Sequence, residues 1–362
     1  MDFRRIISHC CMAYGMAYSI AANQLGVVPR PRMGYLMMTW KCNLRCVMCG
    51  VWKEERYKQL NTQDYKKLIR KLPFLDIVKV GGGEPFMRDD MPELITELQN
   101  VANPYYIMLI TNGTQKDRIV EFAKQCGKPG LHLRLSIEGR GEVHDKLRGR
   151  KGCFGKTMAT LEALLPIMRE KKFVIGINYN ITPETIEHLP WIREICRKEG
   201  LNFIPGYWVT PFLEPGDPKD SKPMVGDFAD YRRRLEELYE QTKGVNAIEA
   251  YFLKKTVFRM YDDAMKSGVK KFACRCNRSI LYVMPDGEAV TCGIKHGSIG
   301  NLVNEDFDDV WFGQKARLAR RDVDACPGCH QYAIKIMSRA YTGESFGLPA
   351  PGRFKCLFDR EK

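Results

Sequence analysis

The sequence contains no low-complexity tract and no repeat of fixed period, so it shows no sign of a fibrous or repeat architecture. Its 362 residues are 44% hydrophobic and 28% charged, which is the composition of a globular protein and excludes a largely disordered chain. This length allows one large domain of roughly 200 to 250 residues together with a smaller one.

Acidic residues are scarcer than basic ones, 43 against 57, and the formal net charge is +14. The basic excess is spread along the chain and is not gathered into a tail. A charge of this sign favours acidic partners, such as an acidic electron-donor protein, a phosphorylated small molecule, an anionic lipid surface or nucleic acid. Charge alone does not choose among them.

The N-terminal segment lacks a clean apolar run of the kind that spans a membrane. Residues 6–28 carry no formal charge, but polar side chains dilute them and two glycines weaken them as a helix. We expect residues 1–33 to form a basic and apolar helix that packs on the main domain. A helix lying on a membrane surface, and a spanning helix or export signal, are the alternatives.

The fourteen cysteines do not have the distribution of a disulfide-rich secreted protein, which would be short and would scatter them. Half of them fall in tight groups, at positions 42, 46 and 49, at 274 and 276, and at 326 and 329. Metal or cluster ligation therefore explains them better than disulfides do. The isolated cysteines are expected to be buried apolar residues: Cys10, Cys11, Cys126, Cys153 and Cys196.

Short apolar segments alternate with amphipathic helices between residues 34 and 242. Strands are expected at 34–40, 76–80, 105–111, 131–137, 173–181 and 201–209, and a clear helix at 62–72 with Thr62 as its N-cap. This alternation gives a parallel sheet, and six units are too few for a complete eight-unit barrel. The expected fold class is α/β, a partial (βα)6 TIM-like barrel with its chemistry at the carboxyl ends of the strands.

The barrel is expected to cover residues 34–245, because the rhythm of strands and helices stops after about Asn246. Residues 211–226 hold four prolines among charges and are interpreted as a long loop or linker. Residues 273–362 contain few long helices and six of the fourteen cysteines. We therefore expect a small C-terminal domain at 246–362 that is held together by a metal centre.

Cys42, Cys46 and Cys49 have the spacing C-x3-C-x2-C directly after the first strand. Three thiolates on a tight loop can hold three irons of a cubane cluster and leave the fourth iron without a protein ligand. A zinc site is the alternative, but it requires a fourth Cys or His, and none follows within the loop. After the second strand, residues 81–85 (Gly-Gly-Gly-Glu-Pro) offer glycines that let a ligand approach the backbone.

The motifs CNLRCVMCG and GGGEP together resemble the radical S-adenosylmethionine (radical SAM) superfamily. The resemblance covers the chain from about residue 34 to its end. It implies that the three cysteines ligate a 4Fe-4S cluster and that the methionyl part of S-adenosylmethionine chelates the iron left open. The same resemblance places Gly82, Gly83 and Glu84 at the methionyl end of this cofactor.

Two further segments are similar to the same family. Ser136 and Glu138 close the fourth strand, where relatives often carry Ser-x-Asp-Gly that reaches the ribose, although this chain has Glu in place of Asp. Arg148 stands where an arginine can pair with the cofactor carboxylate, an interaction that suits a planar guanidinium. Asn112 and Asn178, at the third and fifth strands, are expected to form walls of the cofactor site.

Residues 278–292 are expected to form two strands joined by a Pro-Asp-Gly turn. With residues 299–302 and 310–311, this segment resembles the auxiliary-cluster extension called SPASM, or its shorter twitch form. The resemblance implies one auxiliary 4Fe-4S cluster, because the further pair of cysteines expected after residue 329 is absent. Its expected ligands are Cys292, Cys326, Cys329 and one of Cys274 or Cys276, with a slight preference for Cys274 and with Cys356 as a spare. Four-cysteine zinc and covalent haem at the Cys-x-x-Cys-His sequence are the alternatives.

The resemblance implies an enzyme that cleaves S-adenosylmethionine reductively and uses the 5'-deoxyadenosyl radical to abstract hydrogen, which leads to oxidation, epimerisation or C-X bond formation. An acidic protein of the flavodoxin or ferredoxin kind is the expected electron donor. Only about forty residues precede the cysteine triplet, too few for the winged-helix module of many peptide modifiers. We therefore expect a small-molecule or lipid-linked substrate in preference to a peptide.

A cytoplasmic location is expected, with the N-terminus at the inner membrane face as one option, and no nucleic-acid partner is expected. A maturase that cross-links or epimerises ribosomal peptides is the alternative enzyme. A non-catalytic iron–sulfur electron carrier is the alternative outside catalysis. The sequence does not identify a general acid or base.

Overall fold

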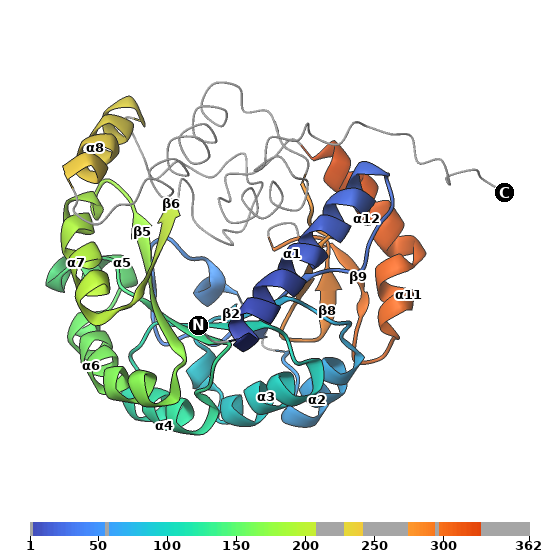
Figure 1. Ribbon diagram of the computed structural model, residues 1–362, viewed down its shortest axis with the longest axis horizontal. Coiled ribbons are helices and arrows are strands. Elements are labelled where there is room, and N and C mark those ends of the chain that lie inside the picture. Colours follow the sequence, from blue (N-terminus) through green and yellow to red (C-terminus); the bar gives the residue numbers. More distant parts are fainter. Residues whose placement is uncertain (1–2, 55–57, 208–227, 242–273, 294–296, 327–362) are drawn as a thin grey trace.

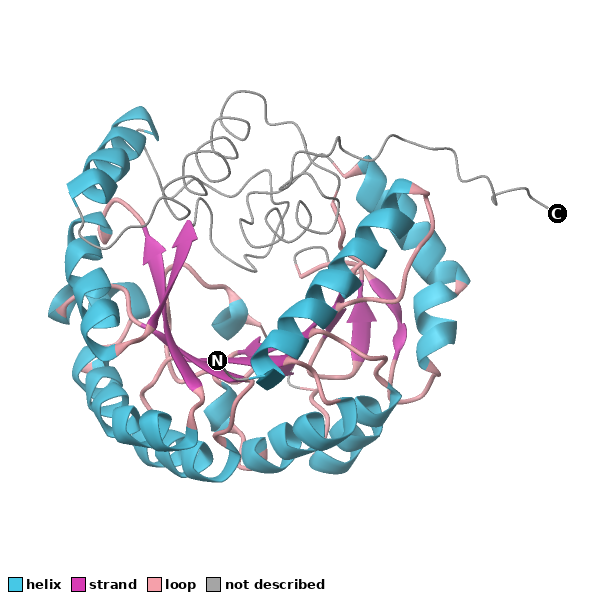
Figure 2. Ribbon diagram, in the orientation of Figure 1, coloured by secondary structure: helices cyan, strands magenta, loops and turns pink. Residues whose placement is uncertain are grey.

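The computed structural model describes residues 3–54, 58–207, 228–241, 274–293 and 297–326. Their strands form one nine-stranded sheet in the order β6-β5-β4-β3-β2-β1-β7-β8-β9. The sheet is curved, and most of the helices lie along its convex side (Figure 1, Figure 2). The concave side and the carboxyl ends of the parallel strands are the places where a barrel of this kind carries its chemistry.

The first six strands are parallel to one another and confirm the predicted partial barrel. They are β1 (Met33–Thr39), β2 (Ile77–Gly82), β3 (Tyr106–Thr111), β4 (Leu131–Ser136), β5 (Val174–Ile181) and β6 (Asn202–Tyr207). Their bounds lie within two residues of the predicted ones, because short apolar runs between polar turns mark strands clearly.

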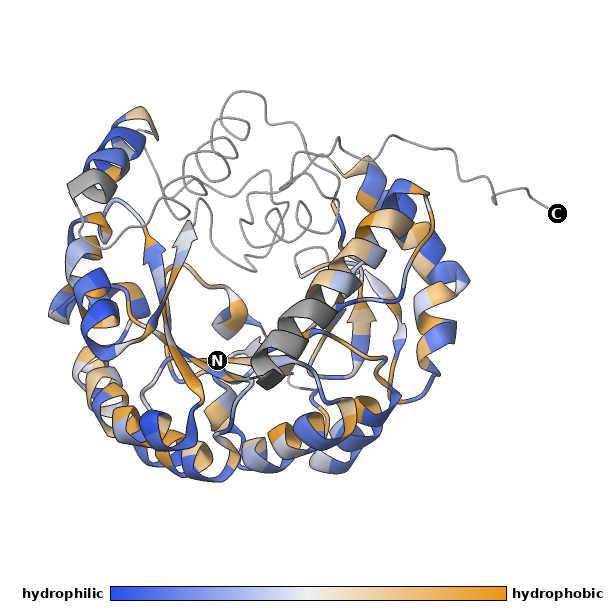
Figure 3. Cartoon of the chain, viewed as in Figure 1, coloured by the Kyte–Doolittle hydropathy of each residue, from blue (hydrophilic) through white to orange (hydrophobic). Residues whose placement is uncertain are grey.

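The helices that connect these strands are α2 (Thr62–Lys71), α3 (Met91–Glu97), α4 (Lys116–Cys126), α5 (Gly141–Arg148), α6 (Cys153–Lys171) and α7 (Leu189–Glu199), followed by α8 (Phe228–Gln241). Every second strand residue packs against them in the main core, as Val78 and Val80 of β2 and Leu133 of β4 do. Figure 3 shows the helices in two colours, as expected of helices with one face on a core. The intervening strand residues therefore face the concave side.

The N-cap of α2 differs from the prediction. Asn61 has the extended backbone of a cap, with φ −74° and ψ 173°, and its side chain accepts a hydrogen bond from the Asp64 backbone N–H. Thr62 is already helical, and its hydroxyl instead donates to Asp90 at 2.6 Å. The prediction of Thr62 as the cap is wrong, because Asn61 is an equally good cap residue one position earlier.

The predicted C-terminal hairpin is confirmed, with β7 (Ile280–Val283) and β8 (Glu288–Val290) pairing antiparallel. Gly287 in its turn has φ +86°, which a glycine adopts without strain. Strand β7 also pairs parallel with β1, and β9 (Ser298–Asn301) extends the sheet beyond β8. The C-terminal strands thus continue the barrel sheet. The predicted boundary at 245/246 and the predicted loop at 211–226 lie outside the described residues.

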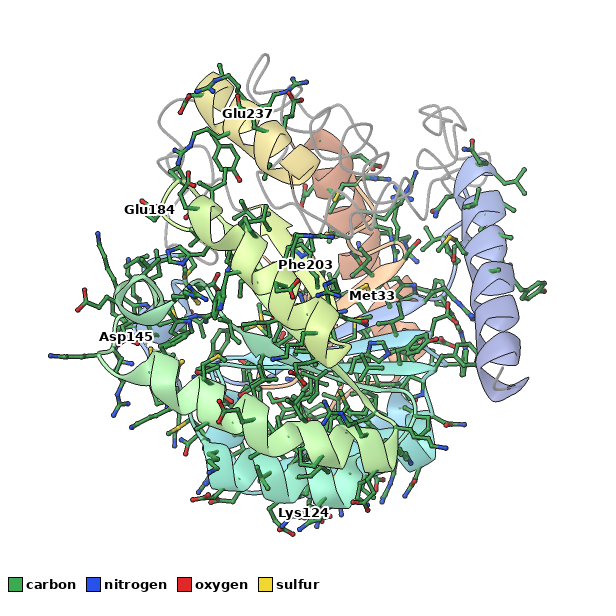
Figure 4. The ribbon with its side chains drawn as sticks, turned by 60° about the vertical axis from the view of Figure 1, so that its left-hand side comes forward. Met33, Lys124, Asp145, Glu184, Phe203 and Glu237 are labelled. Atoms are coloured by element: carbon green, nitrogen blue, oxygen red, sulfur yellow. The ribbon has the colours of Figure 1, made fainter. Side chains whose placement is uncertain are left out.

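Helix α1 (Phe3–Gln24) precedes the barrel and lies beside it (Figure 4). Its C-terminal end is anchored where Asn23 donates to the Ser279 hydroxyl at 3.2 Å. Tyr14 and Tyr18 on the same helix are 75% and 50% exposed. Among the described residues, no helix combines the length and apolar character that crossing a membrane requires.

Helices α11 (Phe307–Phe312) and α12 (Gln314–Ala325) follow β9. Trp311 is fully buried and its indole N–H donates to the Pro29 carbonyl at 3.0 Å. Arg32 in turn forms an ion pair with Asp76 just before β2. The segment between α1 and β1 is therefore held from both the C-terminal helices and the barrel.

Candidate active site

The predicted cysteine triplet lies on the loop that follows β1, at the carboxyl ends of the strands. The sulfurs of Cys42, Cys46 and Cys49 are near enough to interact electrostatically. Burial raises the pKa of Cys42 to about 12 and the pKa of Cys49 to about 11. Three thiols this near one another on one loop fit a cationic metal centre, whose charge would replace their protons. Among the described residues, no three Cys, His, Asp or Glu side chains converge closely enough to share a single metal ion.

The glycines at the end of β2 are required by the close approach of the segment that leads into the cysteine loop. A Cβ on Gly82, which has φ +116°, would lie 2.5 Å from the Thr39 carbonyl oxygen, and one on Gly83 would lie 2.1 Å from that of Lys41. The backbone N–H groups of Gly83 and Glu84 donate to these same two carbonyls, each at 2.8 Å. The sequence predicted that these glycines let a ligand approach the backbone. In the structure, the backbone of residues 39–41 approaches them closely.

Glu84 is buried, and its carboxylate binds the end of β3. It accepts hydrogen bonds from the Thr111 hydroxyl and from the Asn112 backbone N–H, both at 2.7 Å, and from the Phe86 backbone N–H at 3.2 Å. Burial nevertheless raises the pKa of Glu84 to about 7. Much of the capacity of this carboxylate to accept hydrogen bonds is thus used to join β2 to β3.

The Asn112 side chain also bonds within the protein. Its amide N–H donates to Asn43 at 2.8 Å, and its carbonyl oxygen accepts from the hydroxyl and the backbone N–H of Thr114. The Asn43 amide in turn donates to the Thr114 hydroxyl at 2.8 Å. Asn112 therefore connects the cysteine loop to the end of β3, and a contact with a cofactor stays a prediction.

Glu138 and Arg148 form a buried ion pair beside the cysteine loop. The guanidinium of Arg148 donates to Glu138 Oε1 at 2.5 Å and lies 3.7 Å from the Cys46 sulfur. Asn180 fixes the carboxylate with its backbone N–H at 2.7 Å and its side-chain amide at 2.8 Å. Burial alone would lower the pKa of Arg148, but the Glu138 carboxylate and the Cys46 sulfur raise it above its ordinary value. The arginine is thus held charged against the triplet.

Two buried donors beside this pair have no partner within the described residues, Arg148 Nε and His144 Nε2. His144 accepts the Glu138 backbone N–H on Nδ1 at 3.1 Å, so its own proton is assigned to Nε2. Burial, together with the Arg148 charge, lowers the pKa of His144 to about 3, which keeps the ring neutral. Unpaired buried donors are costly, and an anionic or carbonyl group of a bound cofactor would satisfy them.

Ser136 and Asn178 are register partners on β4 and β5, so their side chains lie next to each other. Within the described residues neither side chain makes a hydrogen bond. Ser136 as a contact of the ribose and Asn178 as a wall of the cofactor site both stay predictions.

Cys153 begins α6 and packs in the same small apolar cluster as Cys46. Its thiol donates to Asp145 at 3.2 Å. Like Cys126 and Cys196, it is buried, as predicted. The Cys10 and Cys11 side chains lie outside the described residues.

The C-terminal cysteines form a second group next to β7 and β8. Cys276 is fully buried and hydrogen-bonds with the sulfurs of Cys274 and Cys292, which raises its pKa well above the usual range. Cys326 follows α12 directly, and Val323 one turn earlier packs against Cys276. Cys329 and Cys356 lie outside the described residues. Both Cys274 and Cys276 are placed to ligate, so the choice between them stays a prediction.

Two tyrosines lie between the two cysteine groups. Tyr35 of β1 packs against Cys49, and Tyr282 of β7 packs against Cys276. Their rings meet edge to face with centroids 5.8 Å apart. The pairing of β7 with β1 creates this contact, which the sequence did not suggest.

Sequence reasoning missed Asn43 and Asn180, which hold Asn112 and Glu138 in place. A signal for Asn180 was present, because it lies two residues beyond Asn178 and therefore shares its face of β5. Asn43 carried no such signal, since a loop between cysteines has no periodicity.

Comparison with known proteins gives matches to two families along this chain. A model of the radical SAM superfamily matches residues 36–192, and a model of the SPASM iron–sulfur cluster-binding domain matches residues 274–330. The first match covers the cysteine loop and the ends of β2 to β5, and the second covers the C-terminal cysteine group.

Individual proteins agree with these matches. The AdoMet-dependent heme synthase of Methanosarcina barkeri is 24% identical over 89% of this chain and 98% of that protein. The subtilosin biosynthesis protein AlbA of Bacillus subtilis is 22% identical over 86% of this chain and 68% of that protein. The crystal structure of Streptococcus suis SuiB bound to S-adenosylmethionine has the same fold, with a TM-score of 0.60, 15% identity and coverage of 81% and 68% of the two chains.

The cofactors follow from the two families, namely a 4Fe-4S cluster with S-adenosylmethionine in the barrel and an auxiliary 4Fe-4S cluster in the C-terminal part. The three loop thiols fit the first set, as do the two buried donors beside them that have no partner among the described residues, and the second thiol group fits the other. The chain belongs to the radical SAM superfamily and carries a C-terminal SPASM domain.

Proposed function

We propose that this chain is an enzyme that cleaves S-adenosylmethionine and abstracts hydrogen from a small anionic substrate, an iron porphyrin being the first class to test. The observation that carries the catalytic part is the Arg148 guanidinium: buried Glu138 holds it against the Cys46 sulfur, and its Nε has no partner in the described part of the chain. When bound, the reduced cluster and S-adenosylmethionine supply a 5'-deoxyadenosyl radical that removes hydrogen from an unactivated carbon.

The residues of the chain hold and orient these groups. Cys42, Cys46 and Cys49 would ligate the first cluster, and the free Nε of Arg148 would bind the cofactor carboxylate. The backbone at Gly82 and Gly83 would contact the methionyl amino group. Glu84 and Asn112 would position this loop through the bonds they make within the protein.

The adenosyl side of the cofactor would rest on Ser136 and Asn178, whose side chains are unengaged within the described residues. Glu138 would act through Arg148 and Asn180, since its two carboxylate oxygens bind these residues. For the auxiliary cluster we propose Cys292, Cys326, Cys329 and Cys274 or Cys276 as ligands. These roles position cofactors and need no general acid or base.

The substrate class is supported by two facts. The heme synthase match extends over nearly the full length of that protein, and the net charge of +14 favours a ligand with several carboxylates. The expected small molecule is thus narrowed to an anionic one such as an iron porphyrin. A lipid-linked substrate, an acidic electron donor, a cytoplasmic location and contact with a membrane surface stay predictions.

A ribosomal peptide is the second candidate substrate. It is supported by AlbA, a bacteriocin biosynthesis protein that matches 86% of this chain. We predicted a small molecule in preference to a peptide, and the likeness to AlbA weakens that preference.

The test is anaerobic reconstitution followed by measurement of 5'-deoxyadenosine formed with dithionite. We expect the wild type to form it and a Cys42/Cys46/Cys49→Ala variant to form none, whereas Cys196→Ala on α7, a matched buried cysteine, should keep the activity. Fe-coproporphyrin III, an iron porphyrin with several carboxylates, should raise the yield of 5'-deoxyadenosine more than heme does. A short unstructured peptide should not raise this yield. Absence of 5'-deoxyadenosine under every condition would instead indicate an electron carrier.

A further inference from the structure

Two basic side chains face the concave side of the sheet at its middle. Lys79 lies between the core residues Val78 and Val80 of β2, and Arg134 lies between Leu133 and Leu135 of β4, so both point away from the main core. Met108 of β3 is between them, because it is the register partner of Lys79 and accepts a contact from Arg134 Nη2 at 2.9 Å. Three neighbouring strands thus bring two cations to one place.

Neither cation has a carboxylate partner within the described residues. The Lys79 ammonium lies over the ring of Tyr35, 4.9 Å from its centroid. Among the residues that the structure places, the Arg134 guanidinium donates to the Met108 sulfur, a weak acceptor, and its buried Nε has no partner there.

Other buried arginines in the described part of the chain are paired differently. Arg88 is bound by Asp90 at 2.6 Å, and Arg148 by Glu138 at 2.5 Å. Arg320 donates to the backbone carbonyls of Asn277 and Trp311. Lys79 and Arg134 therefore differ from these three arginines, each of which has an oxygen acceptor.

The pair is unfavourable without a ligand. Burial and the neighbouring Arg134 charge lower the pKa of Lys79 to about 8, and burial lowers the pKa of Arg134 to about 10. Two like charges removed from water and facing each other destabilise the fold unless an anion joins them. A bound oxyanion would satisfy the free guanidinium donors and relieve the repulsion.

The position of the pair suits a substrate. On β4, Ser136 follows Arg134 by two residues on the same face and lies at the cofactor end of the strand. Two residues of strand correspond to roughly 7 Å, so the cations lie one layer below the proposed adenosyl side of the cofactor. An anionic group held there would leave the rest of its molecule near the site of hydrogen abstraction.

We propose that Lys79 and Arg134 form a binding site for a carboxylate of the substrate inside the barrel, an assignment that rests on the anionic substrate class proposed above. The planar guanidinium of Arg134 engages the carboxylate through its fork of donors, and the Lys79 ammonium adds a second charge. Nothing in the cysteine motifs or in the two family matches assigns a role to either residue.

The test measures binding of Fe-coproporphyrin III to full-length, anaerobically reconstituted protein by the change in porphyrin absorbance. We expect Lys79→Met and Arg134→Met each to weaken binding at least about tenfold, since a hydrogen bond to a charged group is lost. Lys79→Arg keeps the charge and should bind within a few-fold of the wild type, whereas Arg134→Lys keeps the charge but loses the fork of donors and should bind more weakly than Lys79→Arg. Lys124→Met removes one charge from the exposed outer surface of α4 (Figure 4) and should bind unchanged.

A second readout separates this site from the proposed substrate. At fixed ionic strength, citrate should raise the thermal unfolding midpoint of the wild type but not that of the Lys79→Met/Arg134→Met double variant. If citrate does so while no porphyrin binds, the anion site stands and the porphyrin assignment fails. If the methionine variants bind porphyrin as the wild type does, or if neither ligand distinguishes them from the wild type, the site is refuted.

Discussion

At the scale of single residues, the pair of Glu138 and Arg148 is the interaction on which the proposed site depends. Glu138 is fully buried, and the Arg148 side chain is 11% exposed. Solvent therefore screens this pair little, and the two asparagine bonds from Asn180 complete the coordination of the carboxylate. Glutamate in place of the aspartate that the family resemblance led us to expect is compatible with the site, because the side chain reaches both Arg148 and Asn180.

Replacing Glu138 by Gln should destabilise the protein by about 3 kcal/mol, because a buried guanidinium loses its counter-charge. The measurement is urea unfolding under anaerobic conditions. Glu194→Gln removes the same charge from an exposed i,i+3 pair with Arg197 and should change the unfolding free energy by less than about 0.5 kcal/mol. Equal effects of the two substitutions would show that burial of the Glu138 pair is unimportant.

At the scale of elements, the junction between the β1 loop and the end of β2 determines where the cysteines lie. The two segments share backbone hydrogen bonds at Gly83 and Glu84. They approach each other too closely for a side chain at Gly82 or Gly83. The glycine motif was recognisable in the sequence, but its reason was not. Glycines in a sequence indicate that some group approaches the backbone closely. Only the fold shows which group this is.

Replacing Gly83 by Ala should displace the cysteine loop, since the new Cβ would lie 2.1 Å from the Lys41 carbonyl oxygen. We expect a reduced iron and sulfide content after reconstitution, measured in a variant whose C-terminal cysteines are replaced so that only the first cluster counts. Gly155→Ala on α6 meets nothing within 4 Å and should retain full iron content with slightly higher stability. Normal cluster loading in Gly83→Ala would contradict the proposed junction.

Among the predicted elements, the strands are confirmed and one helix cap is corrected. The six parallel strands and the C-terminal hairpin were predicted within two residues, because alternation and turn residues are local signals. The α2 cap was displaced by one position, since Asn61 and Thr62 are both good caps and the backbone conformation chooses between them.

At the scale of the whole molecule, the barrel and the C-terminal strands share one sheet. The parallel pairing of β7 with β1 places Leu281 beside Gly34 and Val283 beside Leu36. This pairing also brings Tyr282 to Tyr35 and so places the two cysteine groups on either side of one aromatic contact. The two predicted domains are therefore joined through the first strand.

Amides of β7 should consequently exchange with solvent in the same cooperative unit as those of β1, because opening either strand breaks the shared ladder. Hydrogen–deuterium exchange of the full-length protein at several denaturant concentrations measures this. The free energy of the opening through which β7 amides exchange could be about 2 kcal/mol lower than the free energy for β1 amides. That result would mean that the C-terminal strands unfold independently.

The sequence by itself determined the rhythm of strands and helices, the spacing of both cysteine groups and the family that these features resemble. Each of these is written in residues close together along the chain, where periodicity and turn chemistry act. Tertiary structure alone decided that Arg148 meets Cys46, that β7 joins β1, and that Lys79 and Arg134 come near each other with no carboxylate partner among the described residues. Such contacts join segments far apart in sequence, and they exist only because the curved sheet and its helices pack in one arrangement.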